Sequence, residues 1–73
     1  MLRMHTDLIL GRAEVVEMHN TRCLVRILTG PTAGVCHWLP AVNLQFDAGV
    51  GAEGRLVLRA THDTDVQYIL LPD

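Results

Sequence analysis

The chain contains no serine and no lysine, and these two absences exclude several common mechanisms. A serine nucleophile is impossible, and neither a phosphate-binding P-loop nor a Schiff base can be built without lysine. The stretch Gly30–Gly34, GPTAG, lacks the Gly-Lys-Ser/Thr ending of a phosphate loop. Its proline and glycines predict a turn instead.

The sequence also lacks an excess of basic charge. Its six arginines are outnumbered by eight acidic residues, which gives a formal net charge of −2 at pH 7. This balance provides no electrostatic attraction to nucleic acid or to an anionic membrane. We therefore expect no membrane partner, and the charge disfavours nucleic acid.

Only two cysteines, Cys23 and Cys36, are present, so the chain can form one disulfide at most. Arg3, His5 and Asp7 interrupt any apolar run at the N-terminus, so no signal peptide is predicted. No stretch approaches the roughly 20 apolar residues that span a bilayer. We expect a reduced, cytoplasmic setting in which both thiols are buried as small hydrophobic side chains.

A cysteine–histidine pair is the remaining catalytic option. Cys36 and His37 are adjacent on an expected strand, so their side chains point to opposite faces. Cys23 and His37 could meet across two strands, but no third residue is placed to orient them. A metal site could draw on these three residues and His62, yet no Cys-x-x-Cys or paired-histidine spacing supports one. We expect no enzyme activity, no metal site and no cofactor.

Apolar residues alternate with polar ones along most of the chain, which predicts β-strands. The expected strands cover residues 8–18, 22–29, 35–39, 55–61 and 66–71. Polar or glycine-rich turns are expected at 19–21, 30–34 and 62–65. Residues 41–51 are less regular and predict either one helical turn or an edge strand.

Two of these strands have a pattern that assigns their faces. Ala13 and Val15 share one face of the first strand, whereas Val16 and Met18 share the other, and this switch predicts a β-bulge. In the second strand, alternate residues from Cys23 to Ile27 form an apolar face. The paired strands therefore predict a hairpin with one buried side.

Five short strands with glycine-rich turns predict a single all-β domain over residues 1–73, a small barrel that is closed or nearly closed. Its strand order is expected to be OB-like or, alternatively, SH3-like. Hydrophobic residues make up 49% of the sequence. So small a barrel cannot bury all of them, and we therefore expect apolar surface that contacts a partner, most simply a second copy.

Aromatic side chains are scarce, and they define the candidate binding residues. Single-stranded nucleic-acid binders combine a basic groove with stacking aromatic rings. The residues available for such a surface are Trp38, His37, Phe46, Tyr68, Arg22, Arg26, Arg55 and Arg59. The arginines could align as a basic stripe, or they could form cross-strand pairs with Glu14 and Glu17.

Five segments occur in an order that is found in one family of small barrels. They are Gly11–Val15, Leu24–Ile27, the Trp-Leu-Pro element at 38–40, Val50–Leu58 and Ile69–Pro72. In this order they resemble the OB-fold domain of phage baseplate spike proteins and related injection-machine hubs. The resemblance implies an OB barrel that docks to other protein. It also implies that Trp38 is an anchor in the core or at a subunit interface.

These observations predict a non-enzymatic module for protein binding and assembly, with contacts made by exposed apolar and arginine-bearing strand faces. Its expected partner is a second copy of the chain, another protein, or both. The alternative is a β-barrel that binds single-stranded nucleic acid or a small ligand through Trp38, Tyr68 and the strand arginines.

Overall fold

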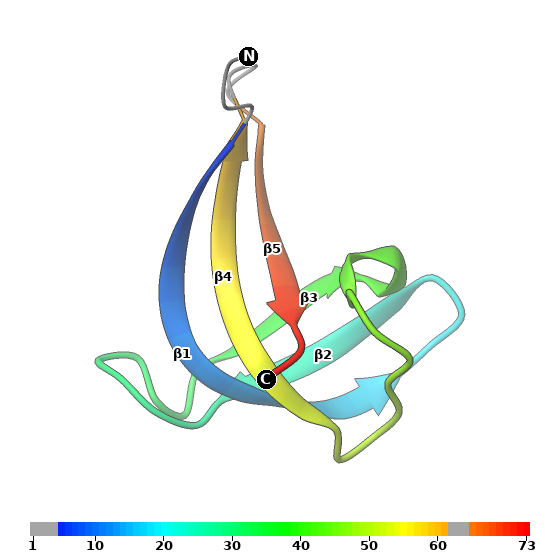
Figure 1. Cartoon of the computed structure of the whole chain (residues 1–73). Helices are drawn as coiled ribbons and strands as arrows, with labels where there is room; N and C mark the ends of the chain where they lie inside the picture. Colours follow the sequence, from blue (N-terminus) through cyan, green and yellow to red (C-terminus); the bar gives the residue numbers. More distant parts are fainter. Residues whose placement is uncertain (1–4, 62–64) are drawn as a thin grey trace.

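The computed structural model describes residues 5–61 and 65–73, and it confirms the all-β fold (Figure 1). The predicted turn at 62–65 lies mostly outside the described residues, as do Arg3 and His62. The elements in chain order are β1 (His5–Met18), β2 (Arg22–Ile27), β3 (Cys36–Pro40), the 3₁₀ turn η1 (Ala41–Asn43), β4 (Glu53–Thr61) and β5 (Val66–Leu71).

The five strands form one antiparallel sheet in the order β3-β2-β1-β4-β5. The long strand β1 pairs with β4 over residues 5–14 and with β2 over residues 13–18. Strand β1 is thus shared by two parts of the sheet, one with β4 and β5 and the other with β2 and β3. Because β1 bends between them, the sheet curls into an open half-barrel. In Figure 1, the first part of β1 rises beside β4 and β5, while β2 and β3 cross below them.

Strand β1 bends at two places where its register shifts. The shift between Val15 and Glu17 confirms the predicted bulge. A second shift, between Ile9 and Gly11, was not predicted. Gly11 has a φ of 142°, and a Cβ atom there would lie 2.3 Å from the backbone oxygen of Thr29. The bend therefore depends on a residue without a side chain.

The strand bounds differ from the predictions at several ends. Strand β1 begins at His5, three residues earlier than expected, because β4 provides a pairing partner up to Thr61. Strand β2 ends at Ile27, where Gly34 N donates a hydrogen bond of 2.7 Å to the Ile27 oxygen and closes the following turn. Strand β3 includes Pro40, which lacks an N–H donor and is tolerated because β3 lies at the sheet edge.

The segment after β3 contains one helical turn, the first of the two alternatives predicted for it. It makes the single turn η1, and then Leu44 forms a parallel bridge with Leu70 of β5. The buried Asn43 side chain donates a hydrogen bond of 2.9 Å to the backbone oxygen of Tyr68. Gln45 N donates another of 2.9 Å to the Leu70 oxygen. These contacts cover the outer edge of β5.

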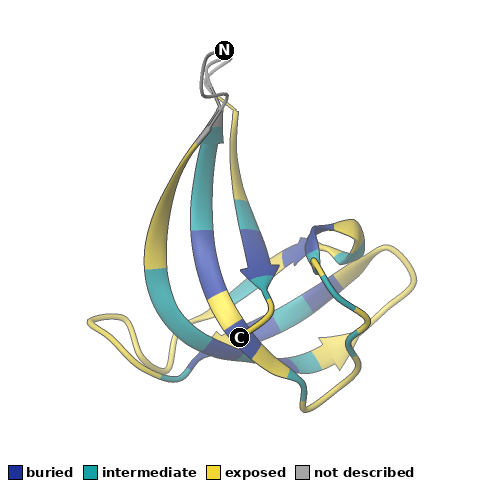
Figure 2. Cartoon of the chain, in the orientation of Figure 1, coloured by how far each residue is buried: buried dark blue, intermediate teal, exposed yellow. Residues whose placement is uncertain are grey.

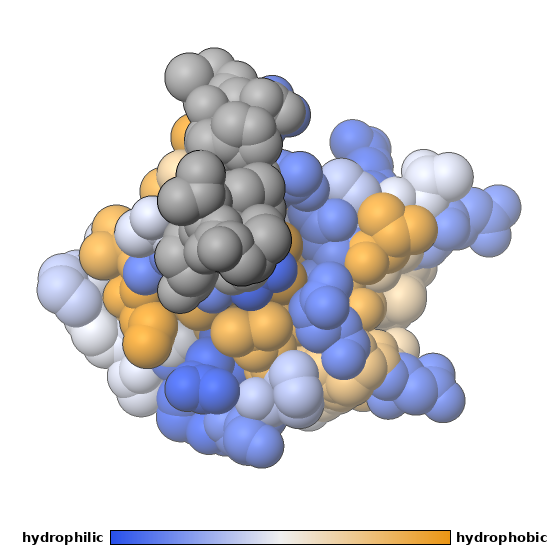
Figure 3. Space-filling view, turned by 45° about the horizontal axis from the view of Figure 1, so that its top comes forward, coloured by the Kyte–Doolittle hydropathy of each residue, from blue (hydrophilic) through white to orange (hydrophobic). Residues whose placement is uncertain are grey.

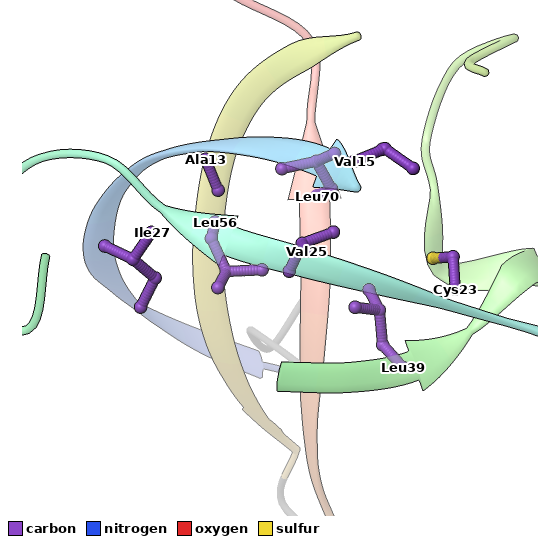
Figure 4. Packing of buried hydrophobic residues seen from close by; sticks show 8 residues of the cluster. All are labelled: Ala13, Val15, Cys23, Val25, Ile27, Leu39, Leu56 and Leu70. Carbon is purple, nitrogen blue, oxygen red and sulfur yellow. The ribbon is translucent and has the colours of Figure 1, made fainter. Parts of the chain in front are cut away.

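The core lies inside the curl, where side chains from all five strands meet (Figure 4). Each residue of this core cluster is at most 2% exposed. The cluster consists of Ala13, Val15, Cys23, Val25, Ile27, Leu39, Leu56 and Leu70. The predicted apolar face of β2 is therefore confirmed. Because alternate strand residues point to one face, a few short side chains from each strand fill the interior.

Three strand ends extend beyond this core and form what we call the arm: residues 6–10 of β1, 58–60 of β4 and 66–68 of β5. Strand β2 does not reach them, since it pairs with β1 only from Ala13 onward. Figure 2 shows the arm portions of β1 and β5 largely as exposed. Residues 6–9 and 66–67 are exposed on both faces of the arm, because successive strand residues point to opposite faces.

Candidate functional site

Trp38 lies on the outer face of the half-barrel. It is opposite Leu24 in the β2–β3 ladder, whereas its neighbour His37 is opposite the buried Val25. Successive strand residues point to opposite faces, so the indole points away from the core. Its exposed fraction is 43%, and the prediction that Trp38 serves as a core residue is wrong. An interface role for Trp38 stays a prediction.

Two polar side chains, His19 and Arg22, contact the indole, and Glu17 contacts His19. Together with Trp38 these residues form what we call the Trp38 cluster. The Arg22 guanidinium carbon lies 4.5 Å from the ring centroid, within cation–π range. The His19 ring is tilted by 46° at a centroid distance of 5.5 Å. Glu17 Oε1 in turn lies 3.1 Å from His19 Nε2. The turn between β1 and β2 therefore supports one side of the indole.

An open hollow of about 320 Å³ adjoins the Trp38 cluster. Its lining residues are Thr21, Arg22, Trp38, Leu39 and Pro40. The hollow lies where Thr21 O accepts a hydrogen bond of 2.9 Å from Ala41 N, which holds the β1–β2 turn against the end of β3. Such a surface, with an aromatic plane beside a guanidinium, can accept a flat or anionic group.

The other two aromatic side chains lie on the opposite side of β3 from Trp38. Tyr68 stacks on His37 with ring centroids 4.2 Å apart. This pair joins β5 to β3 where the described residues form no backbone ladder. Phe46 is partly buried and packs against the core. Trp38 therefore does not share a single stacking platform with Tyr68 and Phe46, and binding roles for His37, Tyr68 and Phe46 stay predictions.

The four candidate arginines occupy two separate strands with β1 between them. Arg26 lies 3.8 Å from Glu14, its cross-strand neighbour, as the pairing alternative predicted. Arg59 Nε and Nη2 donate hydrogen bonds of 2.7 and 2.9 Å to the Asp7 carboxylate. Arg22 and Arg55 have no carboxylate within ion-pair distance among residues 5–61 and 65–73. The four arginines therefore do not form a continuous basic stripe, because β1 separates them and Glu14 and Asp7 pair with Arg26 and Arg59.

Carboxylates raise the pKa values of two arginines that join distant parts of the chain. Hydrogen bonds from Arg12 to Asp73 and to Glu53 raise the pKa of Arg12 above its ordinary value. The hydrogen bond to Asp7 raises the pKa of Arg59. These guanidinium groups therefore stay charged and paired at any physiological pH, which leaves them little free charge for an anionic ligand.

The two thiols have different environments, and neither forms a disulfide. Cys23 is buried in the core, and this burial raises the pKa of its thiol. Cys36 is exposed, so the prediction that both thiols are buried is wrong for this residue. Its position opposite Arg26 on the outer face explains the exposure. In the part of the chain that the structure describes, no cluster of three or more His, Cys, Asp or Glu could hold a metal ion.

The arm presents apolar side chains that the sequence analysis did not single out. Leu8, Ile9 and Val66 are 61%, 59% and 57% exposed, respectively. In the ladder, Leu8 lies opposite Leu58, which lies opposite Tyr68, so one apolar row crosses the arm. Figure 3 shows hydrophobic side chains reaching the surface across the middle of this side of the molecule. The continuous run Leu8-Ile9-Leu10, which breaks the alternation, is the sequence signal for it.

A further motif occurs in the loop before β4. Residues 49–54 have the spacing Gly-x-Gly-x-x-Gly, which in dinucleotide-binding proteins follows a strand and opens a helix. Here the spacing ends inside β4, at Gly54, and no helix follows it. The structural context of the dinucleotide fingerprint is therefore missing.

Comparisons with known proteins found no match to a family model, a curated protein or a solved structure. The resemblance to the spike hub domain therefore stays a prediction from the sequence. No helix within residues 5–61 and 65–73 is long and apolar enough to cross a membrane.

Proposed function

We propose that this chain is a non-enzymatic assembly module that forms a homo-oligomer through its arm. The observation that carries the proposal is the exposure of Leu8, Ile9 and Val66, each of which leaves more than half of its surface in water. By strand alternation Leu8 and Val66 share one face of the arm and Ile9 lies on the other, so both faces expose apolar surface of the kind that is typical of protein interfaces. Burying a fully exposed side chain of this kind contributes about 1.5–3 kcal/mol, and a two-fold symmetric contact buries each of them twice.

The proposal includes an OB-like barrel. Two features support it: β1 pairs with both β2 and β4, and a short helical turn follows β3. The OB-fold is a five-stranded, partly open Greek-key barrel, and these pairings fit that description. The docking role implied by the resemblance to spike hub domains belongs to the same proposal, since it needs only an exposed protein-binding surface.

Light scattering over a range of micromolar concentrations tests the assembly proposal. We expect a mass that is a multiple of the 8.1 kDa of one chain. The triple variant Leu8→Thr, Ile9→Thr, Val66→Thr is expected to be monomeric and folded, because threonine suits strands and removes the apolar surface. The matched control is Val42→Thr with Val50→Thr, at sites 83% and 68% exposed outside the arm. A monomeric parent chain at every concentration would contradict the proposal.

A second candidate function rests on the Trp38 cluster. Its half-exposed indole, the adjoining hollow and an arginine without a carboxylate partner in the described chain favour binding of an anionic, flat group. Single-stranded nucleic acid has this chemistry, since its bases stack and its phosphates attract arginine. The assembly proposal is favoured over this one because the chain has a net charge of −2 and its other arginines are mostly paired.

Fluorescence of Trp38, the sole tryptophan, measures this second candidate directly. If it holds, a single-stranded oligonucleotide at low salt changes the emission, and added salt reverses the change. Arg22→Ala is expected to weaken this binding about tenfold or more, because a charge-assisted contact contributes about 1.5–3 kcal/mol. Arg55→Ala removes the same charge away from the hollow and is the control. An unchanged emission at low salt rejects nucleic acid as the ligand.

A further inference from the structure

The inference concerns the outer edge of β1 in the arm, and it rests on the proposed function. An edge strand presents a row of backbone N–H and C=O groups that can pair with another strand. From Gly11 onward the loop after β2 occupies this edge of β1: Arg12 N donates a hydrogen bond of 3.0 Å to Thr29 Oγ1, and Leu28 N donates one of 2.7 Å to Arg12 O. On the side away from β4, no described strand pairs with residues 6–9, whereas Gly30 lies against the Leu10 oxygen, which is 2.8 Å from where a Cβ atom at Gly30 would lie.

The other edge of the arm is treated differently. Asn43 and Gln45 donate hydrogen bonds of 2.9 Å to the backbone oxygens of Tyr68 and Leu70, so η1 and the segment after it cover β5 from Tyr68 onward. Proteins usually protect an open edge with lysine, proline or an unpaired charge. Residues 6–10 of β1, TDLIL, contain neither lysine nor proline, and their one charged side chain is paired with Arg59. The β1 edge is therefore left able to accept a strand.

We propose that a second copy of this chain adds to the sheet here, with residues 7–9 of the two β1 strands antiparallel and Leu8 on the two-fold axis. A second copy is the occupant because the same free edge on both chains allows a closed, symmetric contact. The contact joins the two arms into one continuous sheet. It also brings the exposed Leu8 side chains together on one face.

Symmetry and side-chain alternation restrict the register. Directly opposed residues of an antiparallel ladder point to the same face, so a two-fold pair must place one residue opposite itself. Centring the pair on Asp7 would oppose two carboxylates. Centring it on Ile9 would extend the ladder to Gly11, where the backbone of Thr29 already fills the space. Centring the pair on Leu8 avoids both problems, because the ladder then needs only residues 7–9 and stops before Leu10, where Gly30 approaches the backbone oxygen.

Charge also permits the contact between identical copies. In the Leu8-centred register, Asp7 of one copy lies opposite Ile9 of the other, so no like charges face each other. The Asp7 carboxylate is held by Arg59 through two hydrogen bonds within its own chain. Among the described residues that meet at the axis, the Asp7 charge is therefore compensated within each copy.

Site-directed crosslinking tests the register. In a Cys36→Ala background, which leaves only the buried Cys23, the variant Leu8→Cys is oxidised and examined by denaturing gel without reductant. Two cysteines at the two-fold axis lie within disulfide reach of each other. We expect a covalent dimer to form about tenfold faster than with Val66→Cys, because only the axial thiols are held together at high effective concentration. Val66 is the matched control, since it is 57% exposed against 61% for Leu8 but lies on β5.

The outcomes separate this inference from the proposed function. A dimer by light scattering with preferential crosslinking at Leu8 supports both. A stable oligomer without preferential crosslinking at Leu8, or a three-fold assembly, overturns the β1 edge contact and leaves assembly through the arm intact. A monomeric chain overturns both.

A charge variant provides an independent readout. Leu8→Lys removes two apolar side chains from the axis and places two ammonium groups there, so we expect association about tenfold weaker or worse. Val42→Lys adds the same charge outside the arm, at a site that is 83% exposed, and is expected to leave the dimer intact. Equal effects of the two lysines on the dissociation constant would overturn the edge contact.

Discussion

Replacing Leu56 with alanine is expected to destabilise the fold by about 2–5 kcal/mol. Leu56 is 0% exposed and lies in the centre of the core cluster, facing side chains from the other strands (Figure 4). Alanine would lose the transfer free energy of the deleted atoms and leave a cavity. A chain of this length has a total stability of about 4–11 kcal/mol at ordinary values per residue, so a large part of it would be lost.

The matched control for this prediction is Leu58→Ala. Leu58 lies two residues along β4 on the same face, but in the arm, where it is only partly buried. Its truncation removes less buried surface, and we expect a loss of about 1 kcal/mol. Urea denaturation followed by circular dichroism measures both variants. Equal losses at the two sites would mean that the core extends into the arm, contrary to the exposure described above.

The second large effect is expected at Gly11, where alanine should cost about 3 kcal/mol or more. Two causes combine at this position. A Cβ atom would lie 2.3 Å from the Thr29 backbone oxygen, and the φ of 142° is strained for any residue with a side chain. Since the obstacle is backbone, the chain cannot relieve the clash by rotating a side chain. The bend that joins the two halves of the sheet would have to shift.

Two other glycines separate these causes. Gly51 has a φ of 92° and open space around its Cβ position, so Gly51→Ala measures backbone strain alone, about 1 kcal/mol. Gly49 has open space and no positive φ, and Gly49→Ala should be neutral or slightly stabilising. Thermal unfolding of the three variants should rank Gly49, Gly51 and Gly11 in order of increasing loss. A Gly11 variant no worse than the Gly51 variant would show that the loop at Thr29 can move.

Much of the fold could be predicted because strand periodicity is a local property. Alternation assigned Cys23 and Ile27 to a buried face, and the change of phase after Val15 located a bulge. The bulge at Leu10 was not predicted, because in three consecutive apolar residues no alternation shows which side chain points to the core. The bounds of β1 were misjudged at its start because only pairing with β4 extends the strand to His5.

The residues of the candidate site could be predicted from the sequence, but the contacts between them could not. Trp38 and Arg22 were named from the sequence, but their contact depends on the β2–β3 register, which places Arg22 opposite Pro40 and Leu24 opposite Trp38. The exposure of Cys36 was missed because a thiol is equally compatible with a buried and an exposed strand face. No local pattern distinguishes the two faces of a strand when both carry apolar residues.

By itself, the sequence determined which chemistry is excluded, which segments are strands and which face of β2 is buried. These follow from the side chains present and from their spacing along the chain. The tertiary structure alone decided which charges neutralise each other, since Arg12 meets Asp73 across 61 residues and Arg59 meets Asp7 across 52. It also decided that the arm is exposed. Strand β1 is longer than its partner β2, and the difference in length leaves one edge of β1 without a neighbouring strand among the described residues.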